Sequence, residues 1–182
     1  MKSLCENRAY IDVSILRKGG LFTGQSVLFQ QAIRGAVYDF AVSKDDDRSI
    51  SANAYRDGHK FTQNIPLSWS PSGFGGRRAW LACPQCAGRS RRLYVGAQGF
   101  ACRPCLNLGY ATQRMTATNR AFHRAEKLWA RIGRNEYGIP VGRPNGLHPV
   151  TVARLDETAT TAYMKALGQV AREIDRLEAY AG

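Results

Sequence analysis

Hydrophobic and polar residues alternate along residues 25–67, which is the spacing of β-strands that turn one face toward a core. The pattern predicts four short strands, at residues 26–29, 36–42, 49–55 and 60–65. Turn-forming residues separate them: Gly35, the acidic turn Asp45–Asp47 and the hairpin signal Asp57-Gly58. We therefore expect an antiparallel meander in this part of the chain.

The region before the meander has a more ambiguous pattern. Residues 1–10 carry no strong signal for any element. Residues 12–20 fit an alternating strand, and they also fit a short helix with an Asp12 N-cap that ends at Gly19-Gly20. We favour the helix.

The C-terminal third has helical spacing. Apolar residues recur every three or four positions over residues 119–132, and again from Pro149 to about Tyr180. Pro149 suits the first turn of one long amphipathic helix, and a break near residues 158–161 is the alternative. Residues 66–76 and 133–149 are rich in Gly and Pro, so we expect linkers there.

Four of the five cysteines form two close pairs, Cys83 with Cys86 and Cys102 with Cys105. Two residues lie within each pair and fifteen between the pairs, a spacing typical of a four-thiolate zinc site. A rubredoxin-like iron site and two disulfides are the alternatives, and the lack of a secretion-signal pattern at the start weakens the second. Cys5 stands alone without a recognisable activator, so we interpret it as structural or incidental. We expect one structural Zn²⁺.

Short strands are expected around these cysteines, at residues 79–82, 91–95 and 100–101, with a hairpin at residues 96–99. Pro84 and Pro104 stiffen the two cysteine turns, and Gly88 is expected in the left-handed conformation after the first. This arrangement predicts a zinc ribbon. Four sulfur ligands leave no position for water or substrate, so the ion would not act as a Lewis acid.

Charge distinguishes this chain more than its overall composition does. Its 182 residues are 44% hydrophobic and 22% charged, as in ordinary globular proteins of one to two small domains, but the net charge is +12. Residues 77–134 hold twelve basic residues and the single acid Glu126, so nearly all the excess lies in the segment that contains the cysteine pairs. Most of the basic residues are arginines, which suit bidentate contacts with phosphate.

The predicted helix at residues 119–132 continues this charge as a row on one face. Its cations lie within an arc of about 80° on a helical wheel, opposite the apolar residues. They are Arg120, Arg124, Lys127, Arg131 and Arg134. A row of like charges without interspersed acids is mildly destabilising, which indicates a polyanionic partner. Solubility, pairing with the Asp45–Asp47 turn, and binding to a membrane surface are the alternatives, the last disfavoured by the small apolar arc.

Three arginines near the cysteines extend the expected nucleic-acid contacts: Arg89, Arg91 and Arg92. Trp80, Tyr94 and Phe100 lie close by in sequence and offer either a stacking surface or a small core.

The sequence holds no pattern typical of an active site. His59, His123 and His148 have no catalytic or metal-binding spacing, and an acidic turn explains Asp45–Asp47 more simply than a metal site. No phosphate-binding glycine loop, nucleophile elbow or paired-carboxylate pattern occurs. We do not expect an enzyme.

Residues 72–134 resemble a family of bacterial zinc-ribbon proteins of unassigned function, often found in prophages and other mobile elements. The resemblance rests on Phe74-Gly75-Gly76-Arg77-Arg78-Ala79-Trp80, Cys83-Pro84-Gln85-Cys86, Leu93-Tyr94, Phe100-Ala101-Cys102-Arg103-Pro104-Cys105, Leu108-Gly109-Tyr110 and Gln113-Arg114. Residues 142–155 echo a further basic stretch. The chain departs from the family at Ala87, where Gly is usual, at Leu106, where His is common, and in its opening, which lacks a Gly/Trp-rich segment. The resemblance implies a zinc-binding protein of a bacterium or phage.

The sequence thus predicts an α+β protein in three parts. They are an antiparallel β region at residues 1–70, a zinc ribbon at 71–116 and a helical region at 117–182. We expect a cytoplasmic, nucleic-acid-binding protein of a phage or mobile element, with DNA as the partner and no membrane contact. The sequence is compatible with an oligomer. The alternative is a module that docks by its ribbon or long helix on a larger complex, such as RNA polymerase or host defence machinery.

Overall fold

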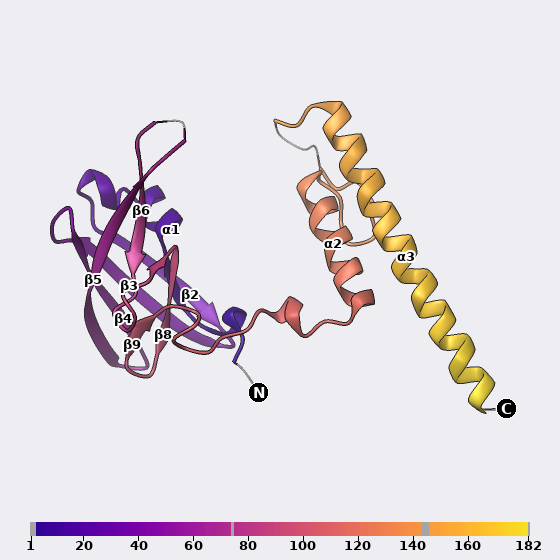
Figure 1. The fold of residues 1–182 in the computed structure, drawn as a ribbon, viewed down its shortest axis with the longest axis horizontal. Helices are drawn as coiled ribbons and strands as arrows, with labels where there is room; N and C mark the ends of the chain where they lie inside the picture. Colours follow the sequence, from indigo (N-terminus) through magenta and orange to yellow (C-terminus); the bar gives the residue numbers. More distant parts are fainter. Residues whose placement is uncertain (1–2, 74, 143–145, 182) are drawn as a thin grey trace. The chain divides into compact units, whose positions relative to one another are not determined.

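The structure is a computed structural model that describes residues 3–73, 75–142 and 146–181 (Figure 1). Phe74 of the family-like motif and residues 143–145 lie outside the described residues. The chain folds into two compact units, Met1–Ala111 and Thr112–Gly182. The first unit is built mainly from β-strands and the second from helices, so the predicted α+β class is confirmed.

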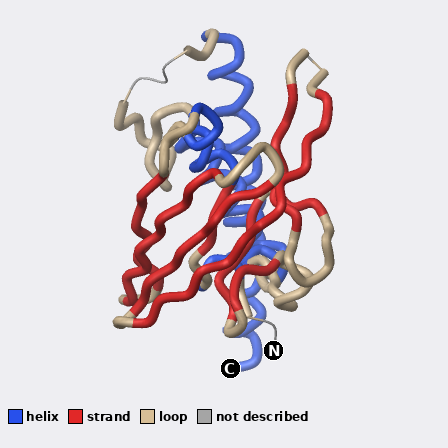
Figure 2. Tube along the Cα trace, turned by 90° about the vertical axis from the view of Figure 1, so that its left-hand side faces the viewer, coloured by secondary structure: helices blue, strands red, loops and turns tan. Residues whose placement is uncertain are grey.

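Unit 1 is a curled arrangement of two antiparallel sheets, whose strands Figure 2 shows wrapping around one another. The six-stranded sheet has the order β2-β3-β4-β5-β6-β7, and the three-stranded sheet the order β1-β8-β9. The strands are β1 (Tyr10–Asp12), β2 (Val27–Ile33), β3 (Ala36–Lys44), β4 (Ser49–Arg56), β5 (His59–Pro71), β6 (Arg77–Ala82), β7 (Arg89–Ser90), β8 (Arg92–Gly96) and β9 (Gly99–Ala101). The predicted meander corresponds to β2–β5, and the predicted hairpin at residues 96–99 joins β8 to β9.

The predicted linker at residues 66–76 is wrong over most of its length. Strand β5 continues to Pro71, pairing first with β4 and then, from Leu67 onward, with β6. Pro66 lies where β5 changes partner, at the position where a residue without an N–H interrupts a ladder least. The expected boundary at residues 70/71 therefore falls within a continuous strand.

Two glutamine side chains join the two sheets. The Gln31 amide donates to the Tyr10 carbonyl and accepts from the Tyr10 N–H, both at 2.9 Å. The side chain of this β2 residue thus bonds to β1 as the backbone of a paired strand would. Gln63 on β5 accepts from the Phe100 N–H of β9 at 2.6 Å. These bonds satisfy backbone groups that the separate sheets leave unpaired.

One core lies between the sheets and includes the cysteine region. Phe40 and Ile50 of the meander pack in the same cluster as Leu81, Cys83 and Phe100. Because the cysteine-bearing strands share their core and their sheets with the meander, residues 71–111 are part of unit 1 and do not form a separate module.

Helix α1 (Val13–Lys18) follows β1 directly. Asp12 caps it by accepting from the Ser14 N–H at 2.8 Å, so the helical interpretation of this segment is confirmed. Short 3₁₀ turns occur at η1 (Cys5–Asn7), η2 (Leu21–Thr23) and η3 (Ala111–Gln113).

Unit 2 is a pair of helices, α2 (Ala117–Arg131) and α3 (Pro149–Ala181). Thr116 caps α2, its hydroxyl accepting from the Asn119 N–H at 3.1 Å. Helix α3 runs without a break through residues 158–161, where the Thr158 hydroxyl donates to the Arg154 carbonyl. The shorter α2 packs on the first half of α3, as Figure 1 shows, with Trp129 and Ala159 in the buried cluster.

Candidate metal centre and cationic surfaces

The four paired cysteines meet at one place in unit 1. Cys83 and Cys86 lie in the turn between β6 and β7, and Cys102 and Cys105 follow β9. All four Sγ atoms lie within 4.8 Å of one another. Cys83 Sγ is 3.9 Å from Cys105 Sγ, and Cys86 Sγ is 3.7 Å from Cys102 Sγ, whereas the sulfurs of a disulfide are about 2.05 Å apart. The cluster can therefore hold a metal ion.

The two cysteine turns have matching backbone bonds. The Ala87 N–H donates to the Cys83 carbonyl at 2.7 Å, and the Leu106 N–H donates to the Cys102 carbonyl at 3.2 Å. Each turn thereby brings both of its sulfurs to the same side. This geometry fits a metal site and not two disulfides, because all five cysteines are free thiols.

The left-handed residue of the first turn is Ala87, with φ 56°, and not Gly88 as the sequence predicted. Gly88 is closely approached by a neighbour instead: a Cβ there would lie 3.2 Å from Cys86 Sγ. In this turn the left-handed backbone, which is strained for a residue with a side chain, is that of Ala87. Gly88 is the residue that the Cys86 sulfur approaches closely.

The thiols differ in how readily they ionise. Burial opposes ionisation of Cys83, but three backbone N–H groups directed at its sulfur, including that of Cys102 at 3.3 Å, bring its pKa down to about 7. Hydrogen bonds from the thiols of Cys102 and Cys86 raise the pKa of Cys105, and burial raises that of Cys102. Hydrogen bonding thus favours the thiolate of Cys83, whereas the pKa values of Cys102 and Cys105 lie above the ordinary thiol value.

The predicted contact residues Arg91 and Arg92 bond to a buried carboxylate. Asp12, only 2% exposed, accepts from Arg91 Nε at 3.3 Å and from Arg92 Nε and a terminal nitrogen at 3.1 and 3.0 Å. Arg92 also lies 4.0 Å from the centre of the Tyr10 ring. Arg89, on the edge strand β7, is exposed and makes no side-chain bond among the described residues.

The aromatic residues near the cysteines serve mainly as core. Tyr94 and Phe100 are buried, so they provide no stacking surface. Trp80 is half-buried, with its indole N–H donating to the Ser70 hydroxyl at 2.9 Å. The structure therefore supports the interpretation that these aromatic residues form part of a core and not a stacking surface.

A cleft of about 520 Å³ lies beside the metal centre. Cys86 and Cys102 form part of its wall, together with a set of cationic and aromatic side chains. These are Arg89, Arg91, Arg92, Arg103, Tyr94 and Tyr110. Arg103 lies over the exposed Tyr110 ring at 5.1 Å and donates to the Leu108 carbonyl at 3.2 Å. Sequence reasoning missed Arg103 and Tyr110, although the position of Arg103 between two ligand cysteines was a usable signal.

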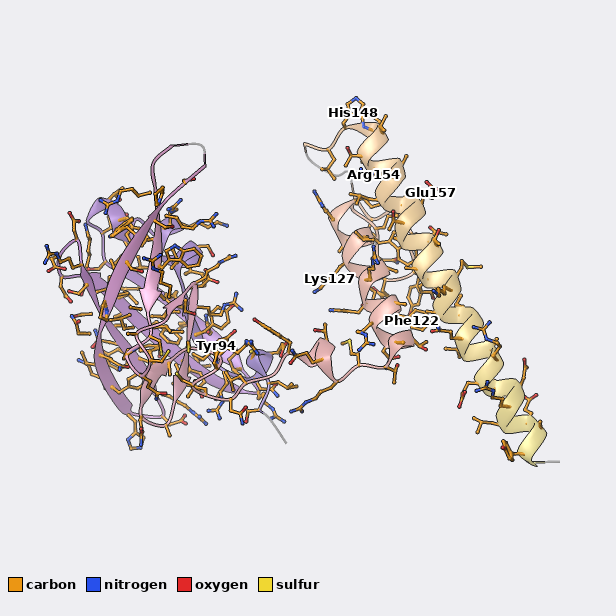
Figure 3. All side chains as sticks on the ribbon, viewed as in Figure 1. Tyr94, Phe122, Lys127, His148, Arg154 and Glu157 are labelled. Atoms are coloured by element: carbon orange, nitrogen blue, oxygen red, sulfur yellow. The ribbon has the colours of Figure 1, made fainter. Side chains whose placement is uncertain are left out.

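Helix α2 carries the other cationic surface. Arg124, Lys127 and Arg131 are exposed and make no side-chain bond among the residues that the structure describes. Figure 3 shows Lys127 on the side of α2 away from α3, whereas Phe122 faces Tyr163 of α3 with ring centres 5.2 Å apart. Arg120 belongs to the same face and donates to the Met115 carbonyl at 3.1 Å.

Arg134, the fifth predicted member of this row, has a structural role. It bonds Asp156 at 2.6 Å and the Gly138 carbonyl at 2.7 Å. Trp129 Nε1 donates to the other Asp156 oxygen at 3.1 Å. The row that remains open to a partner is therefore Arg120, Arg124, Lys127 and Arg131, named below the α2 row.

The acidic turn and the histidines are also engaged locally. Asp46 accepts from the backbone N–H groups of Arg48 and Ser49, both at 2.7 Å, as in an ordinary acidic turn. His148 Nδ1 accepts from the Val150 N–H at 3.3 Å. Among the described residues, no second group of metal-ligating side chains accompanies the cysteines. None of the described helices is long and apolar enough to span a bilayer.

Comparisons of the chain with family models, with curated proteins and with solved structures find no match.

Proposed function

We propose that this chain is a nucleic-acid-binding protein, with DNA as the expected partner, whose first unit is stabilised by one structural zinc ion. The observation that carries the proposal is the α2 row: three of its four cations are exposed and without a partner among the described residues.

The metal is assigned from the donor set and the spacing of its atoms. A tetrahedral ion with Zn–S bonds of about 2.3 Å requires sulfur atoms about 3.8 Å apart. Two of the sulfur pairs, at 3.9 and 3.7 Å, match this value. Two sulfur-bearing turns, after β6 and after β9, are the arrangement that a zinc ribbon uses. Four sulfurs close the coordination shell, which gives the ion a structural role.

The α2 row favours a polyanion because nothing in the helix offsets its charge. The one acid of α2, Glu126, lies 3.6 Å from His123 and not from a row cation. Like charges three and four residues apart cost a few tenths of a kcal/mol per pair. A phosphate backbone turns that cost into attraction, because each contact also releases a condensed counterion.

The test is the salt dependence of binding to duplex and single-stranded DNA and to RNA. Each phosphate contact on duplex DNA contributes about −0.9 to the slope of log affinity against log salt. Replacing two row residues, as in Arg124→Gln/Arg131→Gln, should therefore make the slope shallower by about 1.8. A matched control is Arg154→Gln/Arg172→Gln, which removes two exposed arginines of α3 and should leave most of the slope unchanged.

A second candidate function rests on the exposed end of α3. Beyond the part that α2 covers, Val170, Ile174 and Leu177 continue the apolar stripe and are 38–63% exposed. Such a stripe is typical of a protein-docking helix. If the wild-type chain binds no DNA or RNA at low salt, and Ile174→Gln/Leu177→Gln abolishes capture of a protein partner that the wild type binds, docking is the correct function.

A further inference from the structure

Unit 1 carries a second cationic surface that centres on the cleft beside the metal. Arg89, Arg91, Arg92 and Arg103 line this cleft, and Arg91 also lines an adjoining hollow of about 230 Å³. Arg17, Arg78 and Trp80 form other parts of that hollow. Among the described residues, Asp12 is the only carboxylate that lines either depression.

The single acid cannot neutralise this surface for an incoming ligand. Asp12 is 2% exposed, and its two oxygens already accept bonds from Ser14, Arg91 and Arg92. Each guanidinium has five N–H donors, so both arginines keep donors free after bonding Asp12. The Arg91 side chain is 65% exposed and faces both depressions. Asp12 therefore orients Arg91 without covering it.

The opposite side of the cleft depends on the cysteines. Arg89 follows Cys86 by three residues, and Arg103 lies between Cys102 and Cys105. Arg103 lies within the second cysteine turn, and Arg89 begins β7 directly after the first. The cleft thus combines two arginines held by a carboxylate with two arginines in or next to the cysteine turns.

We infer that this cleft binds the phosphodiester backbone of a nucleic-acid strand, with Arg89, Arg91 and Arg103 as its phosphate contacts. Several guanidiniums spread over two adjoining depressions exceed what one isolated phosphate can use, and they match a chain of phosphates. The inference rests on the proposed function and deepens it. The chain has one phosphate-binding surface in each compact unit and binds its partner bivalently.

The decisive experiment compares two double variants of the full chain, loaded with zinc. Arg89→Gln/Arg103→Gln removes the metal-side contacts, and Arg124→Gln/Arg131→Gln removes half of the α2 row. Binding of a fluorescent DNA strand, single-stranded and duplex, is measured over a series of salt concentrations. We expect the cleft variant to make the slope shallower by about 1.4 on the single strand and about 1.8 on the duplex.

The matched control for unit 1 is Arg34→Gln/Arg48→Gln, because both arginines are exposed and neither lines the cleft. This control should change the slope by less than half as much as the cleft variant. Free inorganic phosphate at millimolar concentration is a second arm. If phosphate binds wild type but not the cleft variant, while both proteins bind DNA with the same salt slope, the ligand is a single phosphate, and the inference of a strand is overturned.

A competing role for Arg89 and Arg103 is to balance the negative charge of four thiolates around a divalent ion. Zinc retention against a chelator separates the two roles. If the cleft variant loses zinc more readily while its salt slope equals that of wild type, the arginines serve the metal and the inference fails. If the variant keeps its zinc and loses slope, the cleft binds phosphate.

The outcomes also separate this inference from the proposed function. A shallower slope in the α2-row variant alone supports nucleic-acid binding and overturns the cleft. A shallower slope in the cleft variant alone supports the cleft and removes α2 as the carrier of the function. Losses in both variants that add in the quadruple variant establish two independent surfaces.

Discussion

A buried carboxylate joins three parts of unit 1 at Asp12. The residue ends β1, caps α1 and bonds Arg91 and Arg92 beside β8. Burial alone would raise its pKa, but the hydrogen bonds from Ser14, Arg92 and Arg91 outweigh burial and lower the pKa below the ordinary value. Asp12 is therefore a charged group that the folded state favours over the unfolded state.

The lowered pKa of Asp12 predicts a pH dependence with a definite sign. The stability that Asp12 contributes is fully present above its unfolded pKa of about 3.9, and it is lost as pH falls through the lower folded value. Asp12→Asn should reduce the free energy of unfolding at pH 7 by about 2 kcal/mol, because charged hydrogen bonds are lost. Denaturant unfolding between pH 2 and 7 measures both effects. A variant that loses stability in parallel with wild type below pH 4 would contradict the assignment.

At the scale of single residues, spacing could reveal the metal ligands but not the bonds of the arginines. The two Cys-x₂-Cys pairs are close in sequence, and the structure brings all four sulfurs together. Arg91 and Arg92 were predicted as open contacts because their partner, Asp12, is distant in the chain. The left-handed Ala87 was also beyond sequence reasoning, which assigns such a conformation to the neighbouring glycine.

At the scale of elements, α3 divides into a covered and an uncovered half. The covered half packs Leu155, Ala159 and Tyr163 against Trp129 of α2, and Asp156 bonds the Trp129 indole. Helix α2 has 15 residues and α3 has 33, so the stripe on α3 continues past the end of its partner. Stability of unit 2 should depend on the first half of α3 alone.

Two truncations test this division. A chain that ends at Gly146 loses all of α3, which should expose Trp129 and melt α2, since an isolated helix of this length is marginal in water. A chain that ends at Gln169 keeps the contacts of Trp129 and should retain the melting temperature of unit 2 within a few degrees. Circular dichroism during heating measures both. Equal melting of the Gly146 and Gln169 chains would show that α3 does not stabilise α2.

Hydrophobic periodicity predicted these elements well where their contacts are local. The meander strands, both long helices and the β8–β9 hairpin lie where the pattern indicated. Periodicity did not predict the two-residue strand β7 or the short β1, because each is defined by its pairing with another strand and not by a pattern of its own. Periodicity also did not predict that β5 extends through two prolines. The pairing of β5 with β6 outweighs the local turn signal of these residues.

At the scale of the whole molecule, two of the four clustered cysteines lie within the main core of unit 1. Cys83 and Cys102 belong to the cluster that also contains Phe40 and Ile50. An ion bound by four thiolates therefore holds together the ends of both sheets. Binding of a structural zinc ion contributes on the order of 10 kcal/mol in comparable sites.

The zinc assignment predicts about one zinc ion per chain by elemental analysis. Cys102→Ser should lower that ratio and unfold unit 1, because binding free energy at such a site is folding free energy. Cys5→Ser is the matched control, since Cys5 is equally buried but lies outside the ligand group. A metal-free protein that contains two disulfides would contradict the assignment, as would iron in place of zinc.

The pairing of β1 with β8 determines when unit 1 can form during synthesis. Tyr10 is separated from its partner Tyr94 by the whole meander, and the last of the four clustered cysteines, Cys105, comes later still. Until then, the nascent chain must keep β1 unpaired and the thiols of Cys83, Cys86 and Cys102 without the fourth cysteine. Loop-closure entropy makes such distant pairing slow, whereas the helix pair of unit 2 forms from neighbouring segments. Refolding should therefore proceed in two phases, with a rapid gain of helix and a slower closure of the sheet that coincides with metal capture.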